Sequence, residues 1–250
     1  MSQRYLRPPI IEAVIELRFD GELEQRSIND VAHKLRRHYA DVVPQANVNV
    51  NLNIVLNENS KLGQSASAQA ESRSNGFRLS STDQAELLIL SPLTFAASCV
   101  APYPGWGALF SRFKRDWQTF RDVMGPRKII RVGLRYINRI DIPHEGEVVE
   151  EAEYLTIYPT MPSIFDIMDT YFVQVSYKVR EIGCSVGINT GLVEAPILDH
   201  SSLILDIDLS KTENVPQSPE KLYELMDQMR EWKNNIFESC ITDKSRGLFQ

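Results

Sequence analysis

IIRVGLRYINRIDIP, residues 129–143, is the stretch that decides how this chain folds. Successive side chains of an extended strand point to opposite faces of a sheet, so this stretch has two unlike faces. The apolar face consists of Ile130, Val132, Leu134, Tyr136, Ile140 and Ile142. The other face carries the arginine row, which we define as Arg131, Arg135 and Arg139. The pattern predicts a strand that is buried on one side, with Asn138 as a polar exception that is hydrogen-bonded to backbone or sits at the sheet rim.

The arginine row allows two interpretations. Its members lie four residues apart, or about 13 Å along a strand, so one small phosphate could not bridge all three. Acidic residues with the same alternation occur in two other apolar segments and could pair with the row across strands. These acids are Glu12, Glu16, Asp206 and Asp208. We favour ion pairing on a solvated sheet face and keep contact with an anionic ligand or an acidic partner as the alternative.

Alternating or apolar segments elsewhere in the chain predict further strands. They span about 10–20, 48–56, 71–80, 85–91, 93–100, 171–180, 183–191 and 202–209. The stretch 57–70 between two of them is polar and has no periodicity, which predicts a mobile loop.

Three segments have the apolar spacing of amphipathic helices, and a short fourth helix is expected near 161–169. The three main segments are 27–42, 106–124 and 219–240. Ser27 and Ser218 are the expected N-caps of the first and third, and Pro219 suits the first position of the third helix. The aromatic stripe of the second helix suits a core, and the lining of a small-molecule cavity is the alternative.

The order of these elements indicates the fold class. Strands outnumber helices and mostly follow one another through short turns. This order is typical of an α+β fold, with a mainly antiparallel sheet and about three main helices packed on it. A domain boundary at 57–70 would leave too little core before it, so we expect a single domain over 1–250. The order also allows two related halves, 1–125 and 126–250, although no residue-level repeat supports a duplication.

Composition limits the partners and the compartment. With 27 Lys and Arg against 33 Asp and Glu, the formal net charge is -6, which argues against broad binding to nucleic acid or anionic lipid. The three cysteines are far apart and form neither a disulfide framework nor a CxxC metal pair. No apolar run reaches the about 18 residues of a membrane span, and no export signal is present. We expect a cytoplasmic protein without membrane contact.

No motif identifies a reaction. The chain has no GxSxG serine, and its four histidines have no HExxH or similar metal spacing. Asp206 and Asp208 point to one face and could hold a cation or share a proton, but no third ligand accompanies them. We therefore predict no catalytic residue, no metal and no cofactor, and we lean against an enzyme.

Four segments together resemble a known family. They are PPIIEAVIELRF (8–19), RVGLRYINRIDIP (131–143), LDIDL (205–209) and FESCITDKSRGLF (237–249). On these segments the chain resembles a sporadically distributed protein family of bacteria and archaea. The resemblance covers nearly the whole chain, implies one structural unit and transfers no catalytic residue. Sporadic distribution is typical of mobile or defence-associated genes. The end of the chain, CITDKSRGLF, is also similar to the last helix region of SecB-like export chaperones.

These observations support three hypotheses about function. The first is a non-enzymatic interaction protein, such as an accessory of a stress or defence system, that uses a sheet face or edge. Its partner would be another protein or a second copy of itself. The second is a small-molecule or nucleotide-binding domain in which the arginine row contacts an anionic ligand. The third is a SecB-like chaperone-type binder.

Overall fold

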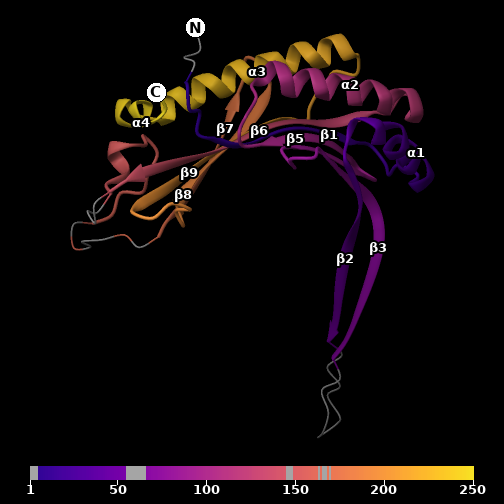
Figure 1. The fold of residues 1–250 in the computed structure, drawn as a ribbon, viewed down its shortest axis with the longest axis horizontal. Helices are drawn as coiled ribbons and strands as arrows, with labels where there is room; N and C mark the ends of the chain where they lie inside the picture. The colour runs from indigo at the N-terminus through magenta and orange to yellow at the C-terminus, as the bar shows by residue number, and fades with distance from the viewer. Residues whose placement is uncertain (1–4, 55–65, 145–148, 163, 165–167, 169) are drawn as a thin grey trace, which may run out of the picture.

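The computed structural model describes residues 5–54, 66–144, 149–162, 164, 168 and 170–250, with the backbone alone for 46–54 and 66–75. In this part of the chain, nine strands form one antiparallel sheet in the order β2-β3-β4-β5-β1-β6-β9-β8-β7 (Figure 1). The strands are β1 (Ile10–Phe19), β2 (Asp41–Ile54), β3 (Ala66–Ser80), β4 (Glu86–Ser91), β5 (Thr94–Val100), β6 (Ile129–Pro143), β7 (Phe172–Val179), β8 (Cys184–Val193) and β9 (His200–Lys211). The predicted α+β fold is confirmed.

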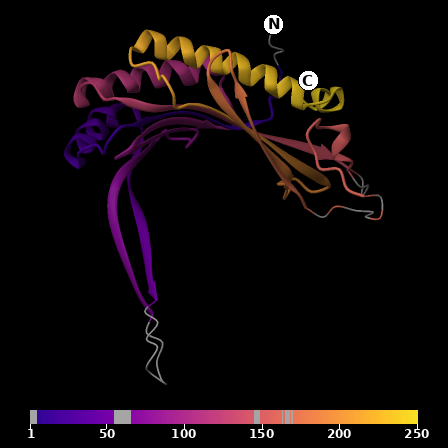
Figure 2. The same cartoon turned by 180° about the vertical axis from the view of Figure 1, so that it is seen from behind.

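The helices cover one face of this sheet. They are α1 (Gln25–Leu35), α2 (Trp106–Met124), α3 (Pro219–Cys240) and α4 (Asp243–Leu248), with 3-10 turns at Arg36–His38 and Glu151–Glu153. Both ribbon views show α2 and α3 on the same side of the sheet, while β2 and β3 extend as a two-stranded ribbon away from the helix layer (Figures 1 and 2). Phe110 of α2 packs edge-to-face on Tyr223 of α3, with 5.6 Å between ring centroids. None of the described helices is long and apolar enough to cross a membrane.

β1 and β6 are neighbours at the centre of the sheet. β5 lies on the outer side of β1, and β9 lies on the outer side of β6. The two halves, 1–125 and 126–250, therefore supply the strands on opposite sides of this central pair, and each half contributes a long helix after its last strand. The single domain and the relation between the halves both stay predictions.

The two faces of β6 follow the predicted alternation from Val132 onward. The apolar face is at most 1% exposed at Val132, Leu134, Tyr136, Ile140 and Ile142. The prediction is wrong for Ile130, which is 41% exposed, while Ile129 is buried instead. A register shift between Arg18 and Phe19 of β1 makes Ile130 the extra residue of a bulge. Because a bulge inserts one residue into the ladder, it turns the side chains beyond it to the opposite face.

The aromatic stripe of α2 packs into the core against the sheet. The ring centroid of Phe95 on β5 lies 5.3 to 5.8 Å from those of Phe113, Trp117 and Phe120. Phe19 of β1 stacks on Phe120 at 5.1 Å. Aromatic pairs of this geometry add to the stabilisation from buried area, so this part of the stripe is a core, as predicted.

The first helix differs from its prediction at both ends. The residue before it is Glu24, which makes no side-chain cap, so the Ser27 cap is wrong. The helix ends at Leu35, and Asp41 already begins β2. The backbone pairing of β2 with β3 overrides the helical spacing that the sequence shows up to residue 42.

Two further predictions fall largely on residues outside the described part. Of the mobile loop predicted at 57–70, residues 66–70 belong to β3, and the rest lie outside the described residues. Of the short helix predicted at 161–169, the described residues are not helical, and the others lie outside the described part.

The faces of β6 can be tested by truncating one apolar side chain on each side of the bulge. Leu134→Ala should lower the free energy of unfolding by about 2 to 5 kcal/mol, because Leu134 is fully buried. Ile130→Ala is the matched control and should cost about 0.5 kcal/mol or less, as expected at an exposed position. Urea melts of the two variants measure both values, and equal losses would contradict the assignment of faces.

Candidate functional site

The arginine row lies on the face of the sheet opposite the helices, and its first two members are bound by carboxylates. Arg131 bridges Glu16 of β1 and Asp208 of β9, with 3.2 Å between the guanidinium and Asp208. Arg135 makes two hydrogen bonds of 2.8 Å to Asp206 of β9. The predicted cross-strand ion pairs are confirmed for these two arginines.

Arg139, the third member, has a different partner from those predicted. It pairs at 2.8 Å with Asp141, two residues along the same strand. Asp141 also accepts a hydrogen bond of 2.6 Å from Ser202 on β9. All three guanidinium groups of the row are thus held by carboxylates, so an anionic ligand would have to compete with these partners. Contact of the row with a ligand or a partner stays a prediction.

The two aspartates of β9 are also engaged in this network. Asp206 accepts hydrogen bonds from Arg135 and, at 2.9 Å, from Asn189 of β8. Burial raises the pKa of Asp208, although Arg131 and Arg135 act in the opposite direction. Among the described residues, no group of three or more histidines, cysteines and acids is placed to hold a metal ion. The ion-pair interpretation therefore accounts for this face.

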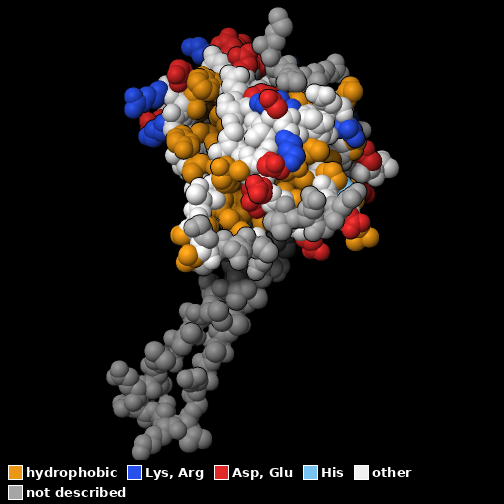
Figure 3. All heavy atoms as spheres, turned by 90° about the vertical axis from the view of Figure 1, so that its left-hand side faces the viewer, with side chains coloured by type: hydrophobic (Ala, Val, Ile, Leu, Met, Phe, Trp, Pro, Cys, Tyr) orange, Lys and Arg blue, Asp and Glu red, His pale blue; other side chains and the backbone are white. Residues whose placement is uncertain are grey.

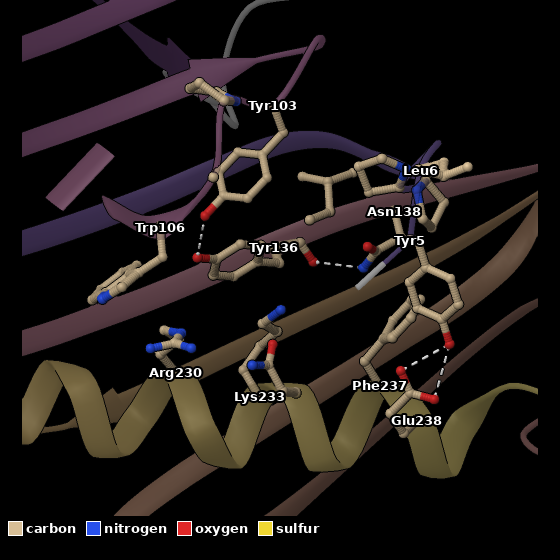
Figure 4. A pocket seen from close by; sticks show the side chains of 16 residues that line it. Tyr5, Leu6, Tyr103, Trp106, Tyr136, Asn138, Arg230, Lys233, Phe237 and Glu238 are labelled. Carbon is tan, nitrogen blue, oxygen red and sulfur yellow. Dashed lines mark hydrogen bonds between the residues drawn. The ribbon is translucent and has the colours of Figure 1, made fainter. Parts of the chain in front are cut away.

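A cavity of ≈ 550 Å³ lies on the helix side, between the sheet and α3 (Figure 4). Its walls come from the segment before β1, the loop between β5 and α2, β6, and the second half of α3. Its aromatic and cationic lining residues include Tyr103, Trp106, Tyr136, Arg230, Lys233 and Phe237. The volume falls within the range of small-molecule sites.

Two cations of α3 line this cavity. Arg230 and Lys233 are three residues apart and therefore lie on the same face of the helix; Figure 4 shows both side chains directed toward the sheet. Lys233 is 8% exposed, and its Nζ lies 4.0 Å from the ring centroid of Tyr136, a cation–π contact. Neither cation forms a hydrogen bond or an ion pair within the described part of the chain.

Polar groups of β6 and of the loop between β5 and α2 complete the cavity wall. The hydroxyls of Tyr103 and Tyr136 are hydrogen-bonded at 2.9 Å, and their rings meet edge-to-face at 5.7 Å. Burial raises the pKa of Tyr103 to about 12 and that of Tyr136 well above its ordinary value, so both hydroxyls stay protonated. Asn138 donates to the Leu205 carbonyl at 2.9 Å, which is the backbone bond that the sequence predicted.

The environment of Lys233 disfavours its charge. Burial, followed by repulsion from Arg230, lowers the pKa of Lys233 to about 8, although Glu238 acts in the opposite direction. Glu238 is itself engaged by the hydroxyl of Tyr5 at 2.9 Å and by Arg246 at 3.0 Å. The ammonium group of Lys233 is thus a buried charge without a direct counter-ion among the described residues.

A second irregularity of β1 shapes the cavity. The β1-β6 ladder shifts register between Ile10 and Glu12, next to Asn138, and the Arg139 amide donates to the Pro9 carbonyl at 2.9 Å. Bulges are common beside binding sites because they bend the strand locally. Here the shift lies where the segment before β1 lines the cavity.

The cavity residues Tyr103, Arg230 and Lys233 were not predicted as a site from the sequence. One signal was present, because Lys233 lies four residues after Met229 and four before Phe237, both buried on the apolar stripe of α3. A lysine at a core position of an amphipathic helix is unusual and indicates either a buried ion pair or a site. The arginine row has a clearer sequence pattern, but the structure gives its members partners.

Comparisons with protein families and with curated proteins identify no relative. No family model matches the chain, and no curated protein matches it significantly. The resemblance to the sporadically distributed family stays a prediction, and the site must be interpreted from its own chemistry.

The lowered pKa of Lys233 predicts how stability depends on pH. The folded-state pKa of about 8 lies below the 10.5 of an ordinary lysine, so the unfolded chain binds more protons between these values. The contribution of Lys233 to the stability of the wild type should therefore rise as the pH rises from about 8 to about 10.5. Lys233→Met removes this dependence. The variant should be more stable than the wild type by on the order of 3 kcal/mol at pH 7, and this difference should shrink as the pH rises from about 8 to about 10.5.

Urea melts of the wild type and Lys233→Met at a series of pH values measure this difference. Lys221→Met, which removes an exposed lysine from the same helix, controls for the loss of a lysine side chain. A difference between wild type and Lys233→Met that does not change with pH would show that Lys233 titrates normally.

Proposed function

We propose that this protein binds a small organic anion in the cavity beneath α3. The observation that supports this function is that Arg230 and Lys233 line one cavity and have no carboxylate partner among the described residues. This is the small-molecule alternative of the sequence analysis, placed at a different site. The arginine row on the opposite face has all of its charges paired and is the weaker candidate.

The cost of burying Lys233 gives the physical argument. A buried ammonium without a counter-ion is disfavoured by several kcal/mol, and proteins normally pair such a charge or neutralise it. The contact with the Tyr136 ring offsets part of this cost. An anion in the cavity would offset more, because it would face Lys233 and Arg230 together.

The other groups of the cavity indicate the chemical class of the ligand. A guanidinium such as Arg230 binds carboxylate or phosphate with two parallel hydrogen bonds. The rings of Trp106, Tyr103 and Phe237 supply flat apolar surface in the same cavity. Trp106 is held in place by a hydrogen bond of 2.8 Å from its indole N–H to Asp227 of α3. A carboxylate or phosphate monoester with a planar apolar part fits these groups.

Thermal shift and calorimetry with matched probes test this function. Benzoate and phenyl phosphate should raise the melting temperature, whereas benzamide, which is neutral and of similar shape, should not. At a ligand concentration of 100 times Kd the gain is about 2.7 kcal/mol, because the ligand binds only the native state. Arg230→Gln and Lys233→Met should each weaken binding by about tenfold or more, as expected when one charged partner is lost.

Arg135→Gln is the control that separates the two candidate sites. It alters the opposite face of the sheet and should leave anion binding unchanged. Binding that is lost in Arg135→Gln and kept in Lys233→Met would move the site to the arginine row and contradict the proposal.

Self-association through β7 is a second candidate function, which corresponds to the interaction protein of the sequence analysis. β7 is an edge strand that pairs only with β8 within the described sheet. Phe172 is 70% exposed and Tyr177 is 58% exposed. The view from the end where β8 and β9 lie in Figure 1 shows hydrophobic side chains gathered in patches on the surface (Figure 3). Prolines and charged side chains usually protect an edge, and this strand contains no proline and one charged residue, Lys178.

A second copy of the chain is the occupant that suits this edge. Antiparallel pairing of β7 with itself keeps the two Lys178 side chains, the one charge on each strand, at opposite ends of the ladder. Light scattering should therefore show a dimer at micromolar concentration, and Tyr177→Lys should dissociate it. Lys178→Ser, which removes a charge from the same strand, should leave the dimer intact. A monomer at all concentrations in the wild type would contradict this candidate.

A cytoplasmic location is also part of the proposal. Cys99, Cys184 and Cys240 are buried free thiols. Burial raises the pKa of each thiol to about 11, which keeps them unreactive. Free thiols in the core are typical of proteins from reducing compartments.

A further inference from the structure

The cavity contains a single primary amine among its lining residues, that of Lys233. More than nine-tenths of this residue is buried, and its Nζ is directed over the Tyr136 ring toward the cavity (Figure 4). No described residue accepts a hydrogen bond from this Nζ. An amine in this position is available to a ligand, because no bond within the protein has to be broken first.

The surroundings also favour the neutral, nucleophilic form of the amine. Burial and the charge of Arg230, one turn earlier on α3, both act against protonation of Lys233. A pKa of about 8 leaves about a tenth of the side chain neutral at pH 7, whereas an ordinary lysine is neutral in fewer than about one in a thousand molecules. Desolvation and a neighbouring cation are the two features that activate lysines which attack carbonyl groups.

We propose that Lys233 forms a reversible imine with the carbonyl group of a small 2-oxo acid whose carboxylate is bound by Arg230. This inference rests on the proposed function, since it uses the same cavity and the same anion contact. Arg230, the other cation of the cavity, determines which class of carbonyl compound fits. A simple aldehyde would leave the guanidinium of Arg230 unpaired, whereas a 2-oxo acid carries a carboxylate directly beside its carbonyl carbon.

The step needs no oxidant, reductant or second substrate. The lone pair of Nζ attacks the carbonyl carbon, and the carbonyl π electrons move to oxygen, giving a carbinolamine after one proton passes from nitrogen to oxygen. A second proton, donated through the hydroxyls of Tyr103 and Tyr136, is added to this hydroxyl, which leaves as water while the nitrogen lone pair forms the C=N bond of a protonated imine. The remaining proton on nitrogen then passes back to the hydroxyls that supplied the second proton. The net reaction converts an amine and a carbonyl into an imine and water.

The hydrogen-bonded hydroxyls of Tyr103 and Tyr136 line the same cavity. Because both stay protonated, they can hydrogen-bond the carbinolamine oxygen and relay a proton to it. In this scheme they position the ligand and its proton, and Lys233 is the residue that forms the bond.

Reductive trapping tests the proposal on the whole chain. The protein is incubated with phenylpyruvate and cyanoborohydride, and the adduct is located by intact-mass and peptide mass spectrometry. We expect one adduct per chain, on Lys233, forming at least tenfold faster than adducts on exposed lysines. Lys233→Arg, which keeps the charge, should abolish the fast adduct, and Lys221→Arg on the same helix should not. Arg230→Gln should slow trapping by about tenfold, since it removes the carboxylate contact.

A protection experiment requires no variant and covers the case in which Lys233→Arg does not fold. Benzoate, which has the carboxylate and no carbonyl, should block the fast adduct in the wild-type protein. Adducts spread evenly over exposed lysines, or a fast adduct that benzoate does not block, would overturn the proposal. If benzoate still stabilises the protein through Lys233 and no fast adduct forms, the imine is excluded while the anion-binding function stands. If benzoate neither stabilises the protein nor blocks the adduct on Lys233, the imine and the anion-binding function are both contradicted.

Discussion

The alternation of side chains along β6 is the constraint on which the rest of the structure depends. β6 lies between β1 and β9, so its register fixes both halves of the sheet. A slip of one residue would expose Leu134 and place Arg135 beneath the helices, and each change would cost several kcal/mol. The ion pairs of Arg131 with Glu16 and of Arg135 with Asp206 favour the same register from the opposite face. The arginine row is therefore best explained as part of the framework.

The cavity has its origin in the same strand, because the buried face of β6 is not wholly apolar. It carries the hydroxyl of Tyr136 and the amide of Asn138, and each of these groups has a hydrogen-bond partner. Lys233 packs over the first of these residues, and within the described part of the chain its ammonium group has no hydrogen bond or ion pair beside the contact with the aromatic ring. Lys233 is a buried cation of the cavity with no hydrogen-bond partner among the described residues, and a ligand bound there would complete its contacts.

The sequence could predict those features that depend on local periodicity. The strand alternation of β6 and the capped, amphipathic α3 both have strong local signals, and both were predicted correctly from residue spacing. The exposure of Ile130 could not be predicted, because the bulge that causes it depends on pairing with β1. The helical spacing after Leu35 was misleading for the same reason, since pairing with β3 decides that segment.

The site could not be predicted from local sequence patterns, because it is assembled from segments far apart in the chain. Tyr103, Tyr136 and Lys233 come from a loop, a strand and a helix, and only the fold brings them together. The arginine row, by contrast, is visible as a pattern because its members share one strand. Regular spacing thus indicated the paired charges, while the unpaired charge of Lys233 showed only as one lysine on an apolar helix stripe.

The binding site depends on the ammonium group of Lys233, which forms no ion pair with any described residue. An NMR titration of the Lys233 side chain, assigned by comparison with Lys233→Met, measures its protonation directly, with and without benzoate. We expect a midpoint near the pKa of about 8 in the free protein and a higher midpoint when benzoate is bound, because the anion stabilises the charged form. A midpoint near the ordinary lysine value of 10.5 under both conditions would contradict the account.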